Sequence, residues 1–307
     1  MVKPVKTDAI FSNIVRCPSC QGTLLFSRTY ARCHRCHTRY AIKGGILYLY
    51  EPTRVSQEVK KQENHSNWYA HNEKQSYDEY EHTPFWKSVD ADTFDRWIPM
   101  VSSKALVLDV GCAQGRSAFP FVRHGIRVIG YDISDKLIAI AQKRSAPYKR
   151  FVTSPYFFVG DASNFSFSDA SFDVVVLHGV LHHLPNPSHV CKEIARVLKP
   201  DGLFLGLENN KTPVRWVFDL LQRLTPQWRE EAGEEPLISE YMLARWFEGT
   251  GMSFSIQTRV FVPPHIINLL SSDIAHWILH TTDTACSRIP IVRSFGGLIE
   301  IIGKKNA

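Results

Sequence analysis

The sequence has no hydrophobic run long enough to cross a membrane: no stretch approaches the roughly 18 uncharged apolar residues that a spanning helix needs. The first twelve residues, MVKPVKTDAIFS, also lack the apolar core of a signal peptide. With 44% hydrophobic and 21% charged residues, the composition is that of a globular protein. We therefore expect a cytoplasmic protein whose seven cysteines stay reduced or bind metal rather than form disulfides.

Cysteine is sparse over most of the chain and concentrated near the N-terminus. The sequence contains Cys17-Pro-Ser-Cys20 and Cys33-His-Arg-Cys36, with twelve residues between the two pairs. Each C-x-x-C knuckle turns two thiolates toward one point, so the pattern predicts a tetrahedral zinc site with four cysteine ligands. His34 and His37 lie beside the second pair and are alternative ligands. A redox site needs only one C-x-x-C, and the presence of two argues against it.

Acidic residues are nearly missing from the same segment. Residues 1–52 contain eight Lys and Arg but only Asp8 and Glu51, which accounts for the whole formal net charge of +6. Four thiolates and one zinc ion would contribute −2, so the local excess falls to roughly +4. That excess is too small to require a nucleic-acid partner, and the rest of the chain is neutral.

The G-x-G-x-x-G fingerprint of dinucleotide binding is missing from the glycine-rich part of the chain. Instead, residues 105–134 comprise an apolar run, a small-residue loop from Gly111 to Gly115, a helix-like segment and a second run that ends in Asp132. The first run is apolar on both faces, which is typical of a strand buried between two helical layers. This stretch predicts the first half of a nucleotide-binding α/β unit.

The position of Asp109 indicates which nucleotide this unit binds. Asp109 lies two residues before Gly111, where its carboxylate would repel a pyrophosphate. A ligand that carries an ammonium group and a sulfonium would be attracted instead. S-adenosylmethionine has both groups, and Asp132 at the end of the second strand suits its ribose hydroxyls.

Four motifs carry a family resemblance: VLDVGCAQG, GYDIS, GDASNFSFSDASFDVVVLHGVLHHL and EIARVLKPDGLFL. In this order they resemble class I S-adenosylmethionine-dependent methyltransferases, in particular the branch with the quinone-biosynthesis enzymes. The resemblance spans residues 100–210 and implies an α/β fold with a Rossmann-like seven-stranded sheet and helices on both faces. It implies that Asp161 binds the adenine amino group while Ala162 donates a backbone N–H to the ring. The residues expected around the cofactor are Asp109, Gly111, Cys112, Gly115, Asp132, Ile133, Asp161, Ala162 and His178.

The N-terminal unit resembles a second family. CPSCQGTL, CHRCHTRY and AIKGGILYL are similar to the short zinc-ribbon proteins that activate tRNA, rRNA and release-factor methyltransferases. Versions of this ribbon are also fused to the front of bacterial methyltransferases. We expect a zinc-ribbon domain at residues 1–52, a linker and helical segment over the cofactor at 53–104, and a methyltransferase domain at 105–307. Its variable substrate region is expected at about 209–290.

Two further segments have more than one interpretation. Residues 68–100 are rich in Trp, Tyr and Phe, which either cover the sulfonium through a cation–π contact or anchor a helix to the sheet. Residues 266–279 place apolar side chains at helical spacing. Packing against the core is the interpretation we favour for this stripe, and a pocket for an apolar substrate or contact with a membrane surface are the alternatives.

The chemistry that the resemblance implies is an in-line displacement from a sulfonium, which needs a base only when the acceptor must lose a proton. Further strands are predicted at 156–159, 172–177 and 203–207, a helix at Pro187 after Asn186, and an edge hairpin from strands at 253–261 and 297–304. His182 and His183 follow the fourth strand, at 172–177, and are the candidate bases; packing beneath the loop is the alternative role for one of them.

The loop after this strand lacks the Asn-Pro-Pro-Tyr motif of enzymes that methylate the amino groups of adenine or glutamine. We therefore expect an oxygen or carbon acceptor on a small molecule, lipid or saccharide. An RNA base methyltransferase that docks through the zinc ribbon and a non-catalytic cofactor-binding scaffold remain as alternatives.

Overall fold

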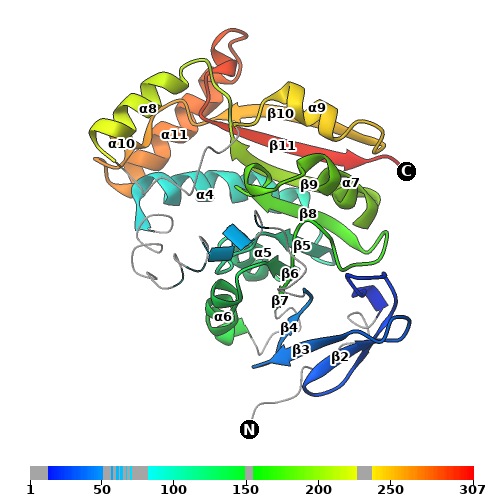
Figure 1. The fold of residues 1–307 in the computed structure, drawn as a ribbon. Coiled ribbons are helices and arrows are strands. Elements are labelled where there is room, and N and C mark those ends of the chain that lie inside the picture. The colour runs from blue at the N-terminus through cyan, green and yellow to red at the C-terminus, as the bar shows by residue number, and fades with distance from the viewer. Residues whose placement is uncertain are drawn as a thin grey trace.

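A computed structural model shows one sheet of 11 strands in the order β1-β2-β3-β4-β7-β6-β5-β8-β9-β11-β10 (Figure 1). The structure describes residues 13–50, 82–148, 155–226 and 237–307, together with single positions between 57 and 70. Helices cover both faces of the central strands (Figure 1).

The five central strands are parallel, and they lie where the hydrophobic pattern predicts them. They are β5 (Leu106–Val110), β6 (Arg127–Asp132), β7 (Tyr156–Val159), β8 (Phe172–His178) and β9 (Leu198–Asn209). Along β5, Leu106 and Leu108 face one hydrophobic core and Val107 faces the other. Because both faces are buried, the central positions of these strands form continuous apolar runs instead of alternating.

Each core is closed by its own helices. On one face lie α7 (Pro187–Val197) and α9 (Glu240–Trp246); on the other lie α4 (Pro84–Trp97), α5 (Ala118–Arg123) and α6 (Asp135–Arg144). Short 3-10 turns follow at η2 (Ile98–Met100), η3 (Ala146–Tyr148) and η4 (Leu181–His183). The predicted antiparallel hairpin at one edge is confirmed as β10 (Met252–Arg259) and β11 (Leu298–Lys305).

The prediction of a seven-stranded sheet is wrong, because the sheet has 11 strands and includes those of the ribbon. These strands are β1 (Leu24–Phe26), β2 (Tyr30–Cys33), β3 (Arg39–Lys43) and β4 (Ile46–Tyr48). β4 pairs in parallel with β7, and Leu49 N donates to Val159 O at 2.6 Å just beyond it. An edge strand presents unpaired backbone groups, and β4 satisfies those of β7.

The N-terminal segment also shares a hydrophobic core with the central sheet. Val15 forms an antiparallel bridge with Phe167, and Arg16 N donates to Ser166 O at 2.8 Å. Leu24 and Tyr40 belong to the same buried cluster as Phe167. The ribbon is therefore packed against the sheet by side chains as well as by backbone pairing.

A group of helices follows β9 and β10 at the opposite edge; we call it the cap. It consists of α8 (Arg215–Leu224), α10 (Pro264–Ile267), α11 (Ser272–Cys286) and the turn η5 (Val292–Ser294). Among the described residues, no helix has the length and apolar character needed to span a bilayer.

The expectation that one helical stripe at 266–279 packs on the core holds only in part, for Leu270 and Ile278. The segment forms two helices, since α10 ends at Ile267 and α11 begins at Ser272. The interruption changes which side chains face inward. Ile266, Ile274 and Trp277 are exposed, whereas Ile267, Ala275 and Leu279 are buried.

Candidate functional site

The loop after β5 takes a path that only small residues permit. Gly111 and Gly115 have φ values of 69° and 91°, in the left-handed region. A Cβ at Gly111 would lie 2.5 Å from Val180 Cγ2, and one at Gly115 would lie 2.5 Å from Phe119 Cε2. The loop backbone is thus held against the segment that follows β8, at the carboxyl edge of the parallel strands.

Asp109 lies beneath this loop and is fully buried. The Ser117 hydroxyl lies 2.8 Å from each of its carboxylate oxygens. Burial raises the pKa of Asp109 to about 8, against a smaller lowering by Ser117. A cation placed beside this carboxyl would take over the role of its proton, because an opposite charge favours the ionised form.

Asp132, at the end of β6, is bound to the glycine loop itself. Its Oδ2 accepts from Ala113 N at 2.9 Å, and its Oδ1 accepts from Ser134 N at 2.8 Å. Burial raises the pKa of Asp132 as well. Cys112 is buried beside these two aspartates, and burial followed by their charges raises its pKa well above the usual value. Its thiol therefore stays protonated, and it serves as a small residue in the loop.

The end of β7 meets the end of β6. Gly160 N donates to Asp132 O at 2.8 Å, and the Tyr131 hydroxyl donates to Asp161 O at 3.3 Å. The Asp161 carboxylate accepts from Ser163 N at 2.7 Å and so shapes its own turn, while Ala162 is half-buried. Three strand ends thus bring the predicted residues of the first, second and third motifs to one edge.

Helix α4 is tied over this edge by charge. The Asp90 carboxylate forms two hydrogen bonds of 2.7 Å with the Arg116 guanidinium, and His178 Nε2 lies 3.4 Å from Asp90 Oδ1. Burial alone would raise the pKa of Asp90, but Arg116 and His178 outweigh it and the pKa is lowered. The His178 ring also stacks on Phe94 at 6.1 Å. The structure therefore places His178 against α4.

The aromatic segment before β5 is only partly described. Trp68, Tyr69, Tyr77 and Tyr80 lie outside the described residues. Of those described, Trp86 lies under the Arg116 guanidinium at 4.7 Å, and Phe94 and Trp97 are buried in the core. These three side chains anchor α4, as one of the two interpretations expects.

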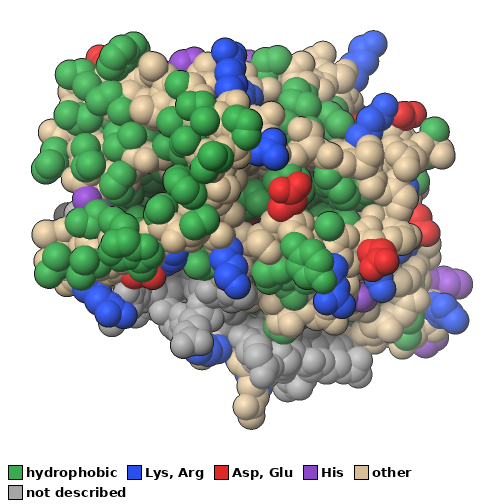
Figure 2. All heavy atoms as spheres, turned by 90° about the horizontal axis from the view of Figure 1, so that it is seen from above, with side chains coloured by type: hydrophobic (Ala, Val, Ile, Leu, Met, Phe, Trp, Pro, Cys, Tyr) green, Lys and Arg blue, Asp and Glu red, His purple; other side chains and the backbone are tan. Residues whose placement is uncertain are grey.

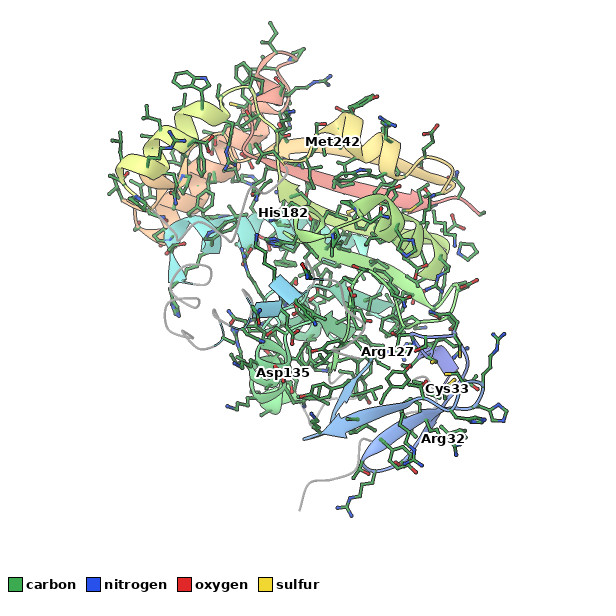
Figure 3. The ribbon with its side chains drawn as sticks, in the orientation of Figure 1. Arg32, Cys33, Arg127, Asp135, His182 and Met242 are labelled. Atoms are coloured by element: carbon green, nitrogen blue, oxygen red, sulfur yellow. The ribbon has the colours of Figure 1, made fainter. Side chains whose placement is uncertain are left out.

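The two histidines after β8 have different surroundings. His182 Nδ1 lies 2.7 Å from Glu208 Oε2, and the other oxygen of Glu208 accepts from Val180 N at 2.9 Å and Leu181 N at 2.8 Å. Glu208 is buried on β9 and therefore fixes the orientation of the His182 ring. His183 lies close enough to Asp132 to counter part of the effect of burial on that pKa. Figure 3 places His182 in the middle of the molecule, far from Cys33.

Sequence reasoning missed four residues of this arrangement: Asp90, Arg116, Ser117 and Glu208. Glu208 carries the same signal that singled out Asp109 and Asp132, an acidic residue at the end of an apolar strand. Ser117 is marked only by its place at the start of a helix after a glycine loop. Asp90 and Arg116 carry no sequence signal, because their pairing joins segments 26 residues apart.

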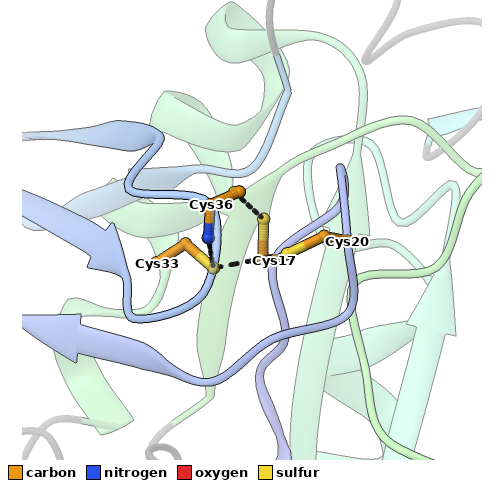
Figure 4. A group of neighbouring side chains, drawn as sticks. All are labelled: Cys17, Cys20, Cys33 and Cys36. Atoms are coloured by element: carbon orange, nitrogen blue, oxygen red, sulfur yellow. Dashed lines mark hydrogen bonds between the residues drawn. The ribbon is translucent and has the colours of Figure 1, made fainter.

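A second site is formed by the four N-terminal cysteines, which the structure brings together (Figure 4). Their sulfur atoms lie within 4.8 Å of one another, with 3.6 Å from Cys17 to Cys36 and 3.5 Å from Cys20 to Cys33. None is in a disulfide. Tetrahedral zinc with bonds of about 2.3 Å separates its sulfur ligands by about 3.8 Å. His34 and His37 are outside this group.

The surroundings of the four cysteines also suit a metal. A Cβ at Gly22 would lie 2.9 Å from Cys33 Sγ, so the backbone there closely approaches the sulfur atoms. The buried Tyr40 hydroxyl lies 3.1 Å from Cys17 Sγ, a contact of the kind that orients metal ligands. The residues present therefore fit a zinc ion.

Comparison with known proteins finds a family match in the same region of the chain. Residues 108–206 match the family model described as "Methyltransferase domain". The chain is 40% identical over 103 residues to 27-O-demethylrifamycin SV methyltransferase of Amycolatopsis mediterranei, covering 33% of this chain and 37% of the relative. It is 34% identical over 133 residues to 2-methyl-6-phytyl-1,4-hydroquinone methyltransferase of Synechocystis, covering 41% of each. The chain thus spans about two fifths of the length of these relatives.

Two solved structures share the fold over most of the chain. One is from a complex between the Haloferax volcanii Trm112 methyltransferase activator and a methyltransferase, at 20% identity, covering 80% of this chain and 97% of that one, with a TM-score of 0.54. The other is Haemonchus contortus phospholethanolamine N-methyltransferase 2 with S-adenosylhomocysteine, at 16% identity, covering 83% and 61%, with a TM-score of 0.55. The fold is therefore that of structurally characterised methyltransferases.

Proposed function

We propose that the protein is an S-adenosylmethionine-dependent methyltransferase. The observation that carries the proposal is the meeting of Asp109, the glycine loop and Asp132 at one sheet edge, within the segment that matches a methyltransferase domain. Asp109 would balance the positive charge of the methyl donor, and Asp132 with Ile133 would bind its ribose. Asp161 and Ala162 would bind adenine, with Gly111, Cys112 and Gly115 leaving room for the ligand.

Charge favours this ligand over a dinucleotide. Asp109 and Asp132 both have raised pKa values, chiefly because they are buried, and Asp132 also raises the pKa of Asp109. A pyrophosphate would add negative charge to this pair, whereas a sulfonium and an ammonium group relieve it. His178 would act indirectly, through its contact with Asp90 on α4.

The acceptor would lose its proton to His182. The methyl donor supplies a methyl group on a positively charged sulfur, which leaves as a neutral thioether. The acceptor oxygen forms a bond to the methyl carbon while His182 Nε2 takes the hydroxyl proton. Nδ1–H of His182 points to Glu208, whose buried charge stabilises the imidazolium that forms. This dyad favours an oxygen acceptor, or a carbon made nucleophilic by loss of a neighbouring proton.

We further propose that the acceptor belongs to a small molecule, lipid or saccharide. The matched relatives are named for 27-O-demethylrifamycin SV and for 2-methyl-6-phytyl-1,4-hydroquinone. Their methyltransferase names support this acceptor class.

Calorimetry with S-adenosylhomocysteine tests the cofactor. We expect saturable binding to the unmodified chain and at least about tenfold weaker binding to Asp132→Asn, which loses a ribose acceptor. The exposed Asp273→Asn is the matched control and should bind normally. Saturation with a dinucleotide but no heat with S-adenosylhomocysteine would contradict the proposal.

Activity on a hydroxyl-bearing acceptor tests the dyad. His182→Ala should lower kcat by about 100-fold or more, and Glu208→Gln should shift the pH–rate profile. The exposed His189→Ala should have no effect. Equal kcat values for His182→Ala and the unmodified chain would exclude His182 as the base. Binding of S-adenosylhomocysteine without transfer to any acceptor would favour the scaffold alternative.

An RNA substrate is the second candidate, and one observation favours it. The ribbon exposes the basic side chains of Arg28, Arg32, Arg35, Arg39 and Lys43. Filter binding of RNA at two salt concentrations separates the two candidates, because phosphate contacts give a steep salt dependence. Tight binding with a steep slope would favour RNA over the small-molecule acceptor.

A further inference from the structure

Helix α8 presents its apolar side chains to solvent. Trp216, Leu220 and Leu224 are 68%, 49% and 69% exposed, whereas the polar Gln222 is only 5% exposed. An amphipathic helix that packs on a protein core has the reverse arrangement, with its apolar stripe inward. The orientation of α8 therefore leaves an apolar stripe unused by the fold.

The neighbouring segments of the cap also expose apolar side chains. The exposed apolar side chains of the cap are Val214, Trp216, Val217, Leu220, Leu224, Ile266, Leu269, Ile274, Trp277, Ile289, Ile291 and Phe295; we call them the apolar face. Figure 2 shows hydrophobic side chains gathered on the face seen from above. A patch of this kind on a soluble fold marks an interaction site.

Specific contacts join the cap segments into one surface. Phe218 of α8 meets the His265 ring of α10 edge to face at 5.9 Å. The Thr212 hydroxyl before α8 donates to Phe295 O at 3.0 Å, and Asn210 Nδ2 donates to Gly296 O at 2.7 Å. The apolar face is therefore held by hydrogen bonds and ring contacts beneath it.

This surface lies at the same end of the sheet as the candidate active site. The cap leaves β9 after Asn209 and β10 after Arg259, and both residues pair with Leu298 at the start of β11. Two residues earlier on β9, Leu207 pairs with His178 at the end of β8. Helix α11 also contacts α4 through His280 Nδ1, which lies 2.7 Å from Asp92 Oδ1.

Most of the charged residues around the apolar face are basic. Residues 211–226 and 263–297 contain no glutamate. Their charged residues are Lys211, Arg215, Arg223, Arg288 and Arg293 against Asp219, Asp273 and Asp283. Asp219 is paired with Arg215 and Asp283 is buried, so the exposed balance is positive. The acidic run at 229–235 lies outside the described residues.

We propose that the apolar face docks the protein on the surface of an anionic lipid bilayer. Trp216 and Trp277 are side chains of the type that favours the headgroup boundary, and the basic residues would meet anionic headgroups. A second copy of the chain fits less well, because a twofold contact would bring Arg223 and Arg293 toward their own copies. If the proposed methyl transfer holds, an apolar acceptor dissolved in the bilayer would reach the site end of the sheet directly.

Sedimentation with lipid vesicles tests the proposal. We expect binding to phosphatidylcholine vesicles that contain phosphatidylglycerol, and much weaker binding to phosphatidylcholine alone. The double variant Trp216→Ser, Leu220→Ser should weaken binding about tenfold or more. Arg223→Gln and Arg293→Gln should each weaken it about fivefold, and only with the anionic vesicles. Leu25→Ser is the matched control, since Leu25 is 59% exposed on β1 of the ribbon and should not affect binding.

The outcomes are distinct from those that test the methyltransferase activity. Heat from S-adenosylhomocysteine should be the same for the double variant and the unmodified chain, which shows that the variant is folded. No sedimentation with either vesicle would overturn the proposal. So would a dimer in light scattering that the double variant makes monomeric, because a second copy would then cover the apolar face.

Discussion

The two edges of the sheet are covered in opposite ways. At one edge the ribbon hides its apolar side chains: Leu24, Tyr40 and Leu47 are buried in a core shared with the central strands. At the other edge the cap turns Trp216, Leu269 and many others outward. The ribbon is small and contains a cluster of four cysteines that could hold a metal ion. The cap is larger and has no such cluster among its described residues.

The two regions are also attached by different forces. Backbone pairing of β4 with β7 and apolar contacts hold the ribbon. The cap is held by helix packing instead of strand pairing: Ile267, Ala275 and Leu279 are buried in the second core, and His280 Nδ1 of α11 lies 2.7 Å from Asp92 Oδ1 of α4. A region whose inner residues already fix it in place can leave its remaining apolar side chains free for another surface. The comparison indicates that the ribbon is an integral part of the packed sheet, whereas the cap keeps many of its apolar side chains exposed.

Loss of the zinc ion that the four cysteines would hold should give the largest effect. Cys33→Ser, or chelation, should destabilise the protein by on the order of 5 kcal/mol, because metal binding contributes directly to folding. Since β4 pairs with β7, protection from hydrogen exchange should fall at Phe158 and Val159 as well as in the ribbon. Cys286→Ser is the control and should be nearly neutral. If only residues 13–50 lose protection, the ribbon folds independently and the comparison fails.

Two leucine substitutions compare how much the ribbon edge and the cap edge contribute to the free energy of unfolding. Leu47→Ala should cost about 3 kcal/mol of unfolding free energy, because it leaves a cavity between the ribbon and β7. Leu220→Ala on the apolar face should change it by less than about 0.5 kcal/mol. Urea unfolding measures both. Equal costs would mean that the cap buries Leu220 in solution.

The pH dependence of cofactor binding tests the site between the two edges. The pKa of Asp109 is about 8 in the folded chain, because the carboxyl is buried. A cationic ligand needs the ionised form, so affinity for S-adenosylmethionine should fall as pH drops below about 8, by up to roughly tenfold per unit. Calorimetry between pH 6.5 and 8.5 measures this, and Asp109→Asn should remove the dependence.

The same group has the opposite effect on stability. A raised pKa means that the folded chain favours the neutral carboxyl, so the stabilisation is complete below about pH 4 and is lost as pH rises to about 8. Asp109→Asn should flatten this part of the stability curve. If the stability of the variant still depends on pH in this range, other titratable groups cause that dependence.

A polar contact inside the cap should have a smaller effect on stability than Leu47→Ala. Asp283 Oδ1 accepts from Val260 N at 2.8 Å and so ties α11 to the end of β10. Asp283→Ala leaves that N–H unsatisfied and should cost about 1–2 kcal/mol in thermal unfolding. Asp283→Asn keeps an acceptor and should cost less. A loss as large as that of Leu47→Ala would show that the cap is as integral to the fold as the ribbon.

Much of the parallel sheet could be predicted, because a strand buried on both faces leaves an unambiguous apolar run. β7 lies at Tyr156–Val159 as predicted, and α7 begins at Pro187 with Asn186 as its N-cap. The proposed site residues that were predicted are close in sequence to one another, as Asp109 and Gly111 are. Glu208 and Asp90 were missed because their partners, His182 and Arg116, are 26 residues away in each case. The cap was misjudged because helical spacing does not say which side of a helix faces the core.

The sequence by itself determined the order of strands along the chain, the two cysteine knuckles and the acidic strand ends, since these are local patterns of hydrophobicity and spacing. Only the tertiary structure decided that β4 extends the sheet through β7, that Glu208 orients His182 and that α8 faces outward. Each of these depends on which distant segment supplies the partner for a backbone edge, a ring nitrogen or an apolar stripe. Sequence spacing cannot specify such partners, because they are chosen by packing in three dimensions.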